Sequence, residues 1–542
     1  MIPLVNCGRI MKKLVRFVWS RMFYGGNHLK KLVQLMLHRT TLVGFAMLVQ
    51  AVLLIVVPYC FPKYAGYFHT FCIIISGIAV LHLINNRINP AYKIAWIVPI
   101  LLFPIFGGVF YGLLGGNKLS KRTRRKLQRI QRKMDQALPL SEQTGDLLCH
   151  MAGHNLSAAN QSTYITEYAI CPPYENTNTE YLPIGEIKFE RLKEELRKAK
   201  HYIFLEYFII EPGIMWDSIL EILQYKVKNG VEVRVIYDDI GCIRTLPHKY
   251  HHQLEAMGIK CCVFNPFRPI LSGRFNNRDH RKIAVIDGKV GFTGGINLAD
   301  EYINALERFG HWKDTAVVLE GRGVWNLAVM FLSMWGYLRG VEENFDDFRP
   351  YFPPEELPVT KGYVQPFNDS PWDQESVGEN VYLNMITRAN RYVYITTPYL
   401  VIDHEMLTAL SNAAKSGVDI RIITPHIPDK WYVHEVSRAH YPLLLENGVR
   451  IYEYTPGFIH AKTFCCDDQF GVVGTINLDY RSLYLHMECG VWMYGTDSIA
   501  DIKYDFIRTM RKSQEITLED CRRVPWYRRL LRAFLRAFAP LM

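Results

Sequence analysis

The first part of the chain is strongly apolar and lacks charged residues over three long stretches. These run over residues 41–61, 64–86 and 94–117. About 20 apolar residues in a helix span the roughly 30 Å hydrocarbon core of a bilayer, so each stretch is long enough to cross it. The third stretch contains several prolines and glycines, which favour a kinked or re-entrant segment. Residues 41–117 therefore predict two to three hydrophobic membrane helices.

Beyond residue 180, short apolar strands alternate with amphipathic helices. Helical periodicity is clear at 214–229 and 404–416, and the order strand, helix, strand, helix, strand, strand occurs twice. This alternation predicts α/β layers. We therefore expect an α/β fold of two tandem halves, at 181–340 and 376–515, that form one unit about a pseudo-two-fold axis. The acidic, proline-rich residues 341–375 predict the linker between them.

Basic segments flank these parts. Residues 1–40 contain eight Lys and Arg and predict either a membrane-surface helix or a disordered tail. The nine basic residues in 118–133 begin a predicted juxtamembrane helix and loop at 118–180. This denser cluster favours a catalytic part on the cytoplasmic side of a multi-pass plasma-membrane protein. Apolar residues at helical spacing among arginines in 516–542 predict an amphipathic helix, either on the membrane or packed on the catalytic core.

The formal net charge of +11 is unevenly distributed. Residues 1–134 hold 20 Lys and Arg and no Asp or Glu, so 43 basic and 52 acidic residues give a balance of −9 in 135–542. The basic part predicts contact with anionic membrane lipids. The acidic remainder argues against nucleic acid as a partner. The twelve cysteines show no C-x-x-C spacing, which predicts reduced thiols and no disulfide framework.

The candidate chemistry lies in a motif that occurs twice, as H-x-K-x4-D with a Gly-x-x-Asn tail. In both copies the asparagine follows the histidine by 17 residues. The six motif residues predicted to be catalytic are His280, Lys282, Asp287, His460, Lys462 and Asp467. The residues predicted to bind the substrate phosphate are Gly295, Asn297, Thr475 and Asn477.

The residue types suit a phosphodiester. On a strand, H-x-K places His and Lys on one face, because strand side chains alternate. The imidazole can attack phosphorus while the ammonium neutralises the phosphoryl oxygens. Two facing copies supply a nucleophile and a general acid, so the chemistry requires no metal ion and no other cofactor.

These paired motifs resemble those of the phospholipase D superfamily. Within it, the apolar N-terminus, residues 477–483 and the basic C-terminus are similar to those of bacterial cardiolipin synthases. The resemblance implies two phospholipase D-like α/β/α halves behind N-terminal transmembrane helices. It also implies transfer of a phosphatidyl group between two phosphatidylglycerol molecules, with His280 as nucleophile and His460 as general acid and base.

Four carboxylates receive supporting roles. Asp287 and Asp467 are expected to brace the motif turns and not to contact substrate. Each imidazole needs an acceptor that fixes its tautomer. Glu488, which follows His460 by 28 residues, resembles the family's usual partner, and Asp314 is the candidate for the first half.

Four alternatives are considered at this point. Water could resolve the same intermediate, which would make the protein a phospholipase D, and another alcohol such as serine could accept the phosphatidyl group. A nuclease is disfavoured by the acidic balance of 135–542. A non-catalytic membrane scaffold that binds anionic lipid is disfavoured because all six motif residues are present.

Overall fold

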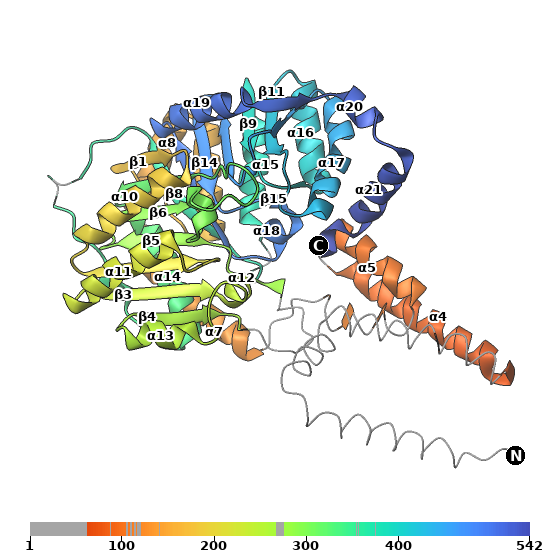
Figure 1. The fold of residues 1–542 in the computed structure, drawn as a ribbon, viewed down its shortest axis with the longest axis horizontal. Helices are drawn as coiled ribbons and strands as arrows, with labels where there is room; N and C mark the ends of the chain where they lie inside the picture. The colour runs from red at the N-terminus through yellow and green to blue at the C-terminus, as the bar shows by residue number, and fades with distance from the viewer. Residues whose placement is uncertain are drawn as a thin grey trace, which may run out of the picture. The chain divides into compact units, whose positions relative to one another are not determined.

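The computed structural model describes residues 52, 62–86, 88–103, 107–108, 111–112, 115, 121–139, 141–266, 276–353, 355, 357–373 and 375–542 (Figure 1). The predictions for residues 1–40, and for all but Val52 of the stretch 41–61, lie outside this range. The chain divides into two compact units, one of residues 1–116 with 268–273 and one of residues 117–267 with 274–542.

The described part of the first unit contains helices α4 (Pro62–Asn85) and α5 (Pro90–Leu102). The Ser76 hydroxyl on α4 donates to the Ile100 carbonyl on α5 at 3.3 Å. Within the described residues, one helix is long and apolar enough to cross a membrane, over Gly66–Asn85. Helix α5 has 13 residues, which at 1.5 Å per residue reach only about 20 Å. One spanning helix is thus supported, and the predicted multi-pass arrangement stays a prediction.

The first half of the second unit is built on a seven-stranded sheet. Its strand order is β1-β7-β6-β5-β2-β3-β4. The strands β2, β3 and β4 run parallel, and the other neighbours pair antiparallel. The strands are β1 (Thr177–Leu182), β2 (Tyr202–Tyr207), β3 (Glu232–Asp238), β4 (Lys260–Phe264), β5 (Lys282–Ile286), β6 (Val290–Gly294) and β7 (Ala316–Gly321). The helices are α10 (Gly185–Lys198), α11 (Ile214–Lys228), α12 (Asp239–Cys242), α13 (Tyr250–Ala256), the 3-10 helix η2 (Asp300–Ile303) and α14 (Val324–Arg339).

The second half repeats this arrangement on an eight-stranded sheet. Its order, β17-β12-β11-β9-β13-β14-β16-β8, matches the first sheet except for the extra edge strand β17. The strands are β8 (Tyr363–Asp369), β9 (Tyr392–Thr396), β11 (Asp419–Pro425), β12 (Arg450–Tyr454), β13 (Thr463–Cys466), β14 (Phe470–Gly474), β16 (Glu488–Tyr494) and β17 (Ser513–Ile516), with a separate pair β10 (Leu400–Val401) and β15 (Leu478–Asp479). The helices are α15 (Val377–Arg388), α16 (His404–Lys415), α17 (Trp431–Glu446), α18 (Tyr480–Tyr484) and α19 (Ser498–Met510). The duplicated α/β architecture is therefore confirmed.

One continuous apolar core joins the halves. It includes strand residues of both sheets and most of α14, which is buried along nearly its whole length. A helix that is apolar all round is typical of the interior of a larger domain. Polar contacts also cross the interface, since Asp505 on α19 accepts from Tyr181 at 2.8 Å and from Lys313 at 2.6 Å. The two halves thus form one folded unit.

Two predicted boundaries need correction. Residues 118–180 are mostly helical and not a helix followed by a loop, with α7 (Lys121–Ala137), α8 (Glu142–His154) and α9 (Leu156–Ala169). Asn155 caps α9 through its side chain, and the cap separates two helices that the sequence left unresolved. The linker predicted at 341–375 contains β8, the edge strand of the second sheet. Its sequence includes Pro366, which an edge strand tolerates but which obscures the strand pattern.

The C-terminal segment is helical, as predicted, with α20 (Leu518–Arg522), α21 (Trp526–Phe538) and the 3-10 helix η5 (Ala539–Leu541). Helix α21 is held by its basic face, because Arg528 and Arg532 donate to Glu435 on α17 at 2.6 and 2.7 Å. Its apolar side chains Trp526, Leu530 and Phe534 are more than 60% exposed. The amphipathic helix therefore binds α17 through its basic face and leaves its apolar face exposed.

Candidate active site

The two motif histidines lie just before the central strands β5 and β13. Each is fixed by a backbone hydrogen bond to the other half of the molecule. The His280 N–H donates to the Met487 carbonyl at 2.9 Å, and the His460 N–H donates to the Lys313 carbonyl at 2.7 Å. These reciprocal contacts hold the two motifs in one buried site.

Each imidazole contacts a buried carboxylate through Nδ1. His280 Nδ1 lies 2.9 and 3.0 Å from the two oxygens of Glu488, and His460 Nδ1 lies 2.6 Å from Asp314 Oδ2. The sequence identified both carboxylates, but the pairing within each half is wrong: each acceptor comes from the opposite half. A carboxylate at Nδ1 holds a proton there and leaves Nε2 with its lone pair.

The site keeps both imidazoles neutral. Burial, followed by the charges of Lys282 and Lys462, lowers the pKa of His280 and of His460 well below the ordinary value. Burial also lowers the pKa of Lys282 to about 8 and that of Lys462 to about 7. Each ammonium donates to the carbonyl of the histidine two residues before it. Since an ammonium has three donors, both lysines can also bind phosphoryl oxygens.

The motif aspartates brace the turns. The Asp287 carboxylate accepts the backbone N–H groups of residues 200–202 at 2.7 to 2.8 Å. Asp467 accepts those of residues 390–392 at 2.7 to 3.0 Å. Both aspartates have a positive φ, of 51° and 56°. They therefore anchor the motif turns to the start of β2 and β9, in agreement with the structural role expected from the sequence.

Two residues predicted to bind phosphate instead support the carboxylates. The Gly295 N–H donates to the Thr315 carbonyl at 2.9 Å, and a Cβ at this position would lie 2.0 Å from Asp314 Oδ1. Glycine is required here because the carboxylate passes so close to the backbone. The Thr475 hydroxyl donates to Glu488 Oε2. Their donors are thus engaged within the protein, and the prediction that they bind phosphate is corrected.

The two motif asparagines differ in their hydrogen-bond partners. Asn297 accepts from the Ile209 N–H at 3.0 Å and donates to the Tyr302 hydroxyl at 2.7 Å, so both ends of its amide have partners. Asn477 Oδ1 is buried and has no hydrogen-bond partner among the described residues. Asn477 therefore keeps an acceptor, which can receive a hydrogen bond from a substrate hydroxyl but not from an ionised phosphoryl oxygen.

Sequence reasoning missed the side chains that pack on the imidazoles. The His280 ring lies 5.0 Å from the Phe208 ring and 5.6 Å from the His486 ring, measured between centroids. The His460 ring lies 5.6 Å from Trp312 and 5.7 Å from Tyr302. The spacing offered a signal, because Trp312-x-Asp314 and His486-x-Glu488 place each ring on the same face as the carboxylate.

Among the residues that the structure describes, one group of side chains could hold a metal ion. The nearest donor atoms of His280, His486 and Glu488 lie within 4.8 Å of one another. Two imidazoles and a carboxylate match a common zinc ligand set. Since Glu488 already binds Nδ1 of His280, such an ion would compete with the hydrogen bond that orients this imidazole.

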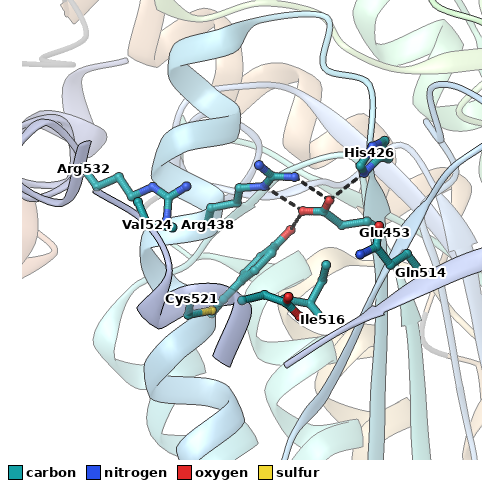
Figure 2. Close-up of a pocket in the computed structure, with 10 residues that line it drawn as sticks. His426, Arg438, Glu453, Gln514, Ile516, Cys521, Val524 and Arg532 are labelled. Atoms are coloured by element: carbon teal, nitrogen blue, oxygen red, sulfur yellow. Dashed lines mark hydrogen bonds and ion pairs between the residues drawn. The ribbon is translucent and has the colours of Figure 1, made fainter. Parts of the chain in front are cut away.

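A cavity of about 160 Å³ lies elsewhere, between the second sheet and the C-terminal segment (Figure 2). No motif residue lines it. Inside, Glu453 accepts from Arg438 at 2.6 and 2.8 Å, contacts His426 Nδ1 at 2.9 Å and accepts from the Tyr441 hydroxyl at 3.2 Å. These polar groups satisfy one another, so the cavity belongs to the packing of the second half.

Comparison with protein families gives two matches. Residues 192–324 and 382–510 match the family described as "Cardiolipin synthase, PLD-like domain", one match in each half. Residues 74–116 match the family described as "Phospholipase_D-nuclease N-terminal".

Individual relatives agree with these matches. An uncharacterized protein of Streptococcus mutans is 46% identical over 470 residues, and the match covers 86% of this chain and 99% of that protein. A cardiolipin synthase of Geobacillus kaustophilus is 36% identical over 470 residues, covering 86% and 91%. A cardiolipin synthase of Halalkalibacterium halodurans is 33% identical over 477 residues, covering 87% and 93%. The crystal structure of phosphatidylserine synthase from Haemophilus influenzae has the same fold, with a TM-score of 0.53, 14% identity and coverage of 71% and 98%.

Proposed function

The chain belongs to the cardiolipin synthase family of phospholipase D-like proteins, and from this we propose that it is a cardiolipin synthase that joins two phosphatidylglycerol molecules. The products are cardiolipin and glycerol. The enzyme is a phosphatidyltransferase of the phospholipase D superfamily, and lipids are its substrates.

The crossed arrangement of the two imidazoles carries this proposal. Two imidazoles, each with Nδ1 on a buried carboxylate and each beside a lysine ammonium, match the needs of double displacement at phosphorus, where one Nε2 attacks and the other carries the proton. One imidazole can act as nucleophile while the other transfers the proton.

In the first step, Nε2 of His280 attacks the phosphorus of phosphatidylglycerol. The N–P bond forms as the bond from phosphorus to the glycerol oxygen breaks, and His460 gives that oxygen a proton. The bound anionic phosphodiester offsets the charges of Lys462 and Lys282, so Nε2 of His460 takes up a proton from solvent when the substrate binds and passes it to the leaving oxygen. Lys282 and Lys462 neutralise the phosphoryl oxygens where negative charge develops.

In the second step, the primary hydroxyl of another phosphatidylglycerol attacks the phosphohistidine. His460 Nε2, now neutral, takes the hydroxyl proton, the new O–P bond forms and the N–P bond to His280 breaks. His280 is neutral again and His460 again carries the proton that it held when the first substrate was bound, and the steps use no metal ion or other cofactor. In the second half-site, Asn477 Oδ1 can accept a hydrogen bond from a substrate hydroxyl.

The surroundings favour transfer over hydrolysis. The basic first 134 residues suit an anionic lipid surface, and the apolar helix α4 suits attachment to a membrane. We place the protein in the plasma membrane as a multi-pass protein, with its catalytic unit on the cytoplasmic side. There both donor and acceptor are lipids, and the buried site limits competition by water.

The test is a metal-free assay with purified full-length protein and phosphatidylglycerol vesicles. Cardiolipin and glycerol, quantified by mass spectrometry, should form in equal amounts, and neither should form with His280→Ala or His460→Ala. Phosphatidic acid in place of cardiolipin would contradict transfer and indicate a phospholipase D. If the phosphatidyl group of the trapped intermediate were found on His460, the roles of the two histidines would be reversed.

A further inference from the structure

The two half-sites correspond position by position, although the residue types differ at some positions. Met487 and Lys313 occupy matching positions, because each carbonyl accepts the backbone N–H of a catalytic histidine. Glu488 and Asp314 follow them and bind the Nδ1 atoms. The residues that precede them, His486 and Trp312, are therefore equivalent as well. Each places a ring 5.6 Å from the neighbouring catalytic imidazole.

The same position thus holds an imidazole beside His280 and an indole beside His460. The chemistry of the two rings differs, because an indole only donates whereas an imidazole can donate from one nitrogen and accept at the other. The surroundings of the two carboxylates also differ. Glu488 receives the Thr475 hydroxyl, while the equivalent Gly295 offers Asp314 no side chain.

His486 is placed to add a further donor to Glu488. Its side chain is 10% exposed, and both ring nitrogens are buried without a hydrogen-bond partner among the described residues. Nδ1 lies 3.7 Å from Glu488 Oε1, a little beyond hydrogen-bond distance. The segment itself is fixed, because the Met487 N–H donates to the Arg278 carbonyl at 2.7 Å and the Asn277 side chain donates to the Leu485 carbonyl at 2.8 Å.

A carboxylate can take this additional bond. It offers about four lone-pair sites, and here His280 and Thr475 use only some of them. An orphaned buried donor is costly, so a small movement of the ring that closes the gap is favourable. The equivalent Trp312 makes no hydrogen bond or ion pair with Asp314 among the described residues.

We propose that His486 is a positioning residue that donates from Nδ1 to Glu488 Oε1 and so makes the His280 half-site the one that forms the covalent intermediate. The bond holds Glu488 against the Nδ1–H of His280 while Nε2 of His280 attacks phosphorus and the leaving oxygen takes its proton from His460. The pseudo-two-fold symmetry of the motifs is thereby broken, and the division of roles between the two histidines has a structural cause. The inference rests on the proposed function only in that the enzyme must cleave a phosphodiester.

The test compares His486→Phe, His486→Asn and Trp312→Phe in the full-length protein, with bis(p-nitrophenyl) phosphate as the chromogenic diester. The burst of nitrophenolate reports formation of the intermediate without reference to the natural lipid. Loss of a hydrogen bond to a charged group should slow the burst about 10-fold in His486→Phe, with little change in KM. His486→Asn keeps a side-chain N–H and should stay within about threefold of wild type, as should Trp312→Phe.

Equal bursts in His486→Phe and wild type would overturn the proposal, as would equal losses in His486→Phe and Trp312→Phe. Failure of His486→Asn to recover the burst while its melting temperature matches wild type would also overturn it. An intact burst without cardiolipin formation from phosphatidylglycerol contradicts the proposed function and leaves this inference standing. For a second readout, trapped phosphatidyl-enzyme from labelled phosphatidylglycerol should show the same order of variants.

Discussion

At the scale of single residues, each catalytic imidazole depends on one carboxylate from the opposite half. Glu488→Gln keeps the shape of the side chain but removes the charge that stabilises the Nδ1 proton of His280. By analogy with the loss of the equivalent carboxylate in other His–carboxylate pairs, formation of the covalent intermediate should fall by roughly 10²- to 10⁴-fold. Single-turnover kinetics with trapped intermediate measure this step.

The matched control for Glu488→Gln is Glu515→Gln, since Glu515 is an exposed residue of β17 that pairs with Arg450. This control should retain activity. Asp314→Asn should instead impair proton transfer through His460. If Glu488→Gln accumulated the intermediate and Asp314→Asn prevented it, the crossed assignment of roles would be wrong.

The buried charges predict a bell-shaped pH dependence. Burial raises the pKa of Asp314 to about 6, so activity should fall on acidification through that value as the carboxylate that orients His460 becomes protonated. Burial lowers the pKa of Lys462 to about 7 and that of Lys282 to about 8, so the ammonium charges are lost as the pH rises through these values. The ratio kcat/KM, measured from about pH 5 to about pH 9, reports the free enzyme.

The variant Lys462→Arg tests the alkaline side of this profile. Arginine keeps its charge, so the fall in kcat/KM should begin at a higher pH than in wild type. A fall at the same pH would contradict the role given to Lys462.

Metal ions should inhibit and not activate. Chelators should leave the activity unchanged, because the proposed steps use only imidazole and ammonium groups. Added Zn²⁺ should lower activity, since an ion held by His280, Glu488 and His486 would compete with the hydrogen bond that orients the His280 imidazole. His486→Asn should weaken this inhibition about 10-fold or more, as loss of one ligand from a three-residue set lowers affinity. Activity that required a divalent ion would contradict the mechanism.

The sequence was informative at this scale wherever residues repeat. Duplication identified His280, His460, the lysines and the bracing aspartates, because the same spacing occurs in both halves. It could not show that Glu488 binds His280, since that contact depends on how the two sheets meet. His486 and Trp312 escaped notice for the same reason: the two residues are equivalent in space, yet they differ in type and lie at different distances from their motifs.

At the scale of elements, regular strands and helices followed from their periodicity. Helices α11 and α16 begin where the pattern predicted, and the two sheets repeat one strand order, as the repeated order of elements along the chain suggested. Edge elements were less predictable. Strand β8 contains Pro366, and its pairing is decided by the neighbouring strand β16, so the sequence suggested a linker there.

Helix α21 leads to a prediction about membrane binding. Arg528 and Arg532 on its basic face donate to Glu435. The apolar side chains Trp526, Leu530 and Phe534 remain exposed. Since anionic lipids would attract the remaining arginines and the substrate is a lipid, we expect the apolar face to insert into the bilayer surface. Losing two such side chains costs about 2 kcal/mol each. The variant Leu530→Asp with Phe534→Asp should therefore raise the apparent KM for vesicle phosphatidylglycerol at least about 10-fold.

Turnover of the soluble chromogenic diester separates membrane docking from folding in this experiment. It should stay unchanged in the α21 variant, because the helix lies outside the motif site. Tyr504→Asp is the matched control, since Tyr504 is a single aromatic residue on α19 that is 69% exposed. If the control raised the KM for vesicles as much as the α21 variant did, docking through α21 would be wrong.

At the scale of the whole molecule, the two halves cannot work separately. The first half carries His280 and Asp314, and the second carries His460 and Glu488, so each imidazole lacks its carboxylate when the halves are parted. The backbone bonds that fix the histidines cross the same interface. The duplicated sequence suggested two similar units, whereas the structure requires both for either histidine to be oriented.

This dependence predicts the behaviour of a divided chain. Val359 is fully exposed and lies between α14 and β8, so a break after it cuts no helix or strand. Fragments 1–359 and 360–542 should each be inactive when expressed alone, with lipid or with the chromogenic diester. Co-expressed, they should recover activity to within about 10-fold of the intact chain, because burial of the shared apolar core drives their association. A break after Phe331, inside the buried helix α14, serves as the control and should give no recovery. Turnover of the diester by either fragment alone would show that a half carries a complete site, and the crossed pairing would then not be needed for catalysis.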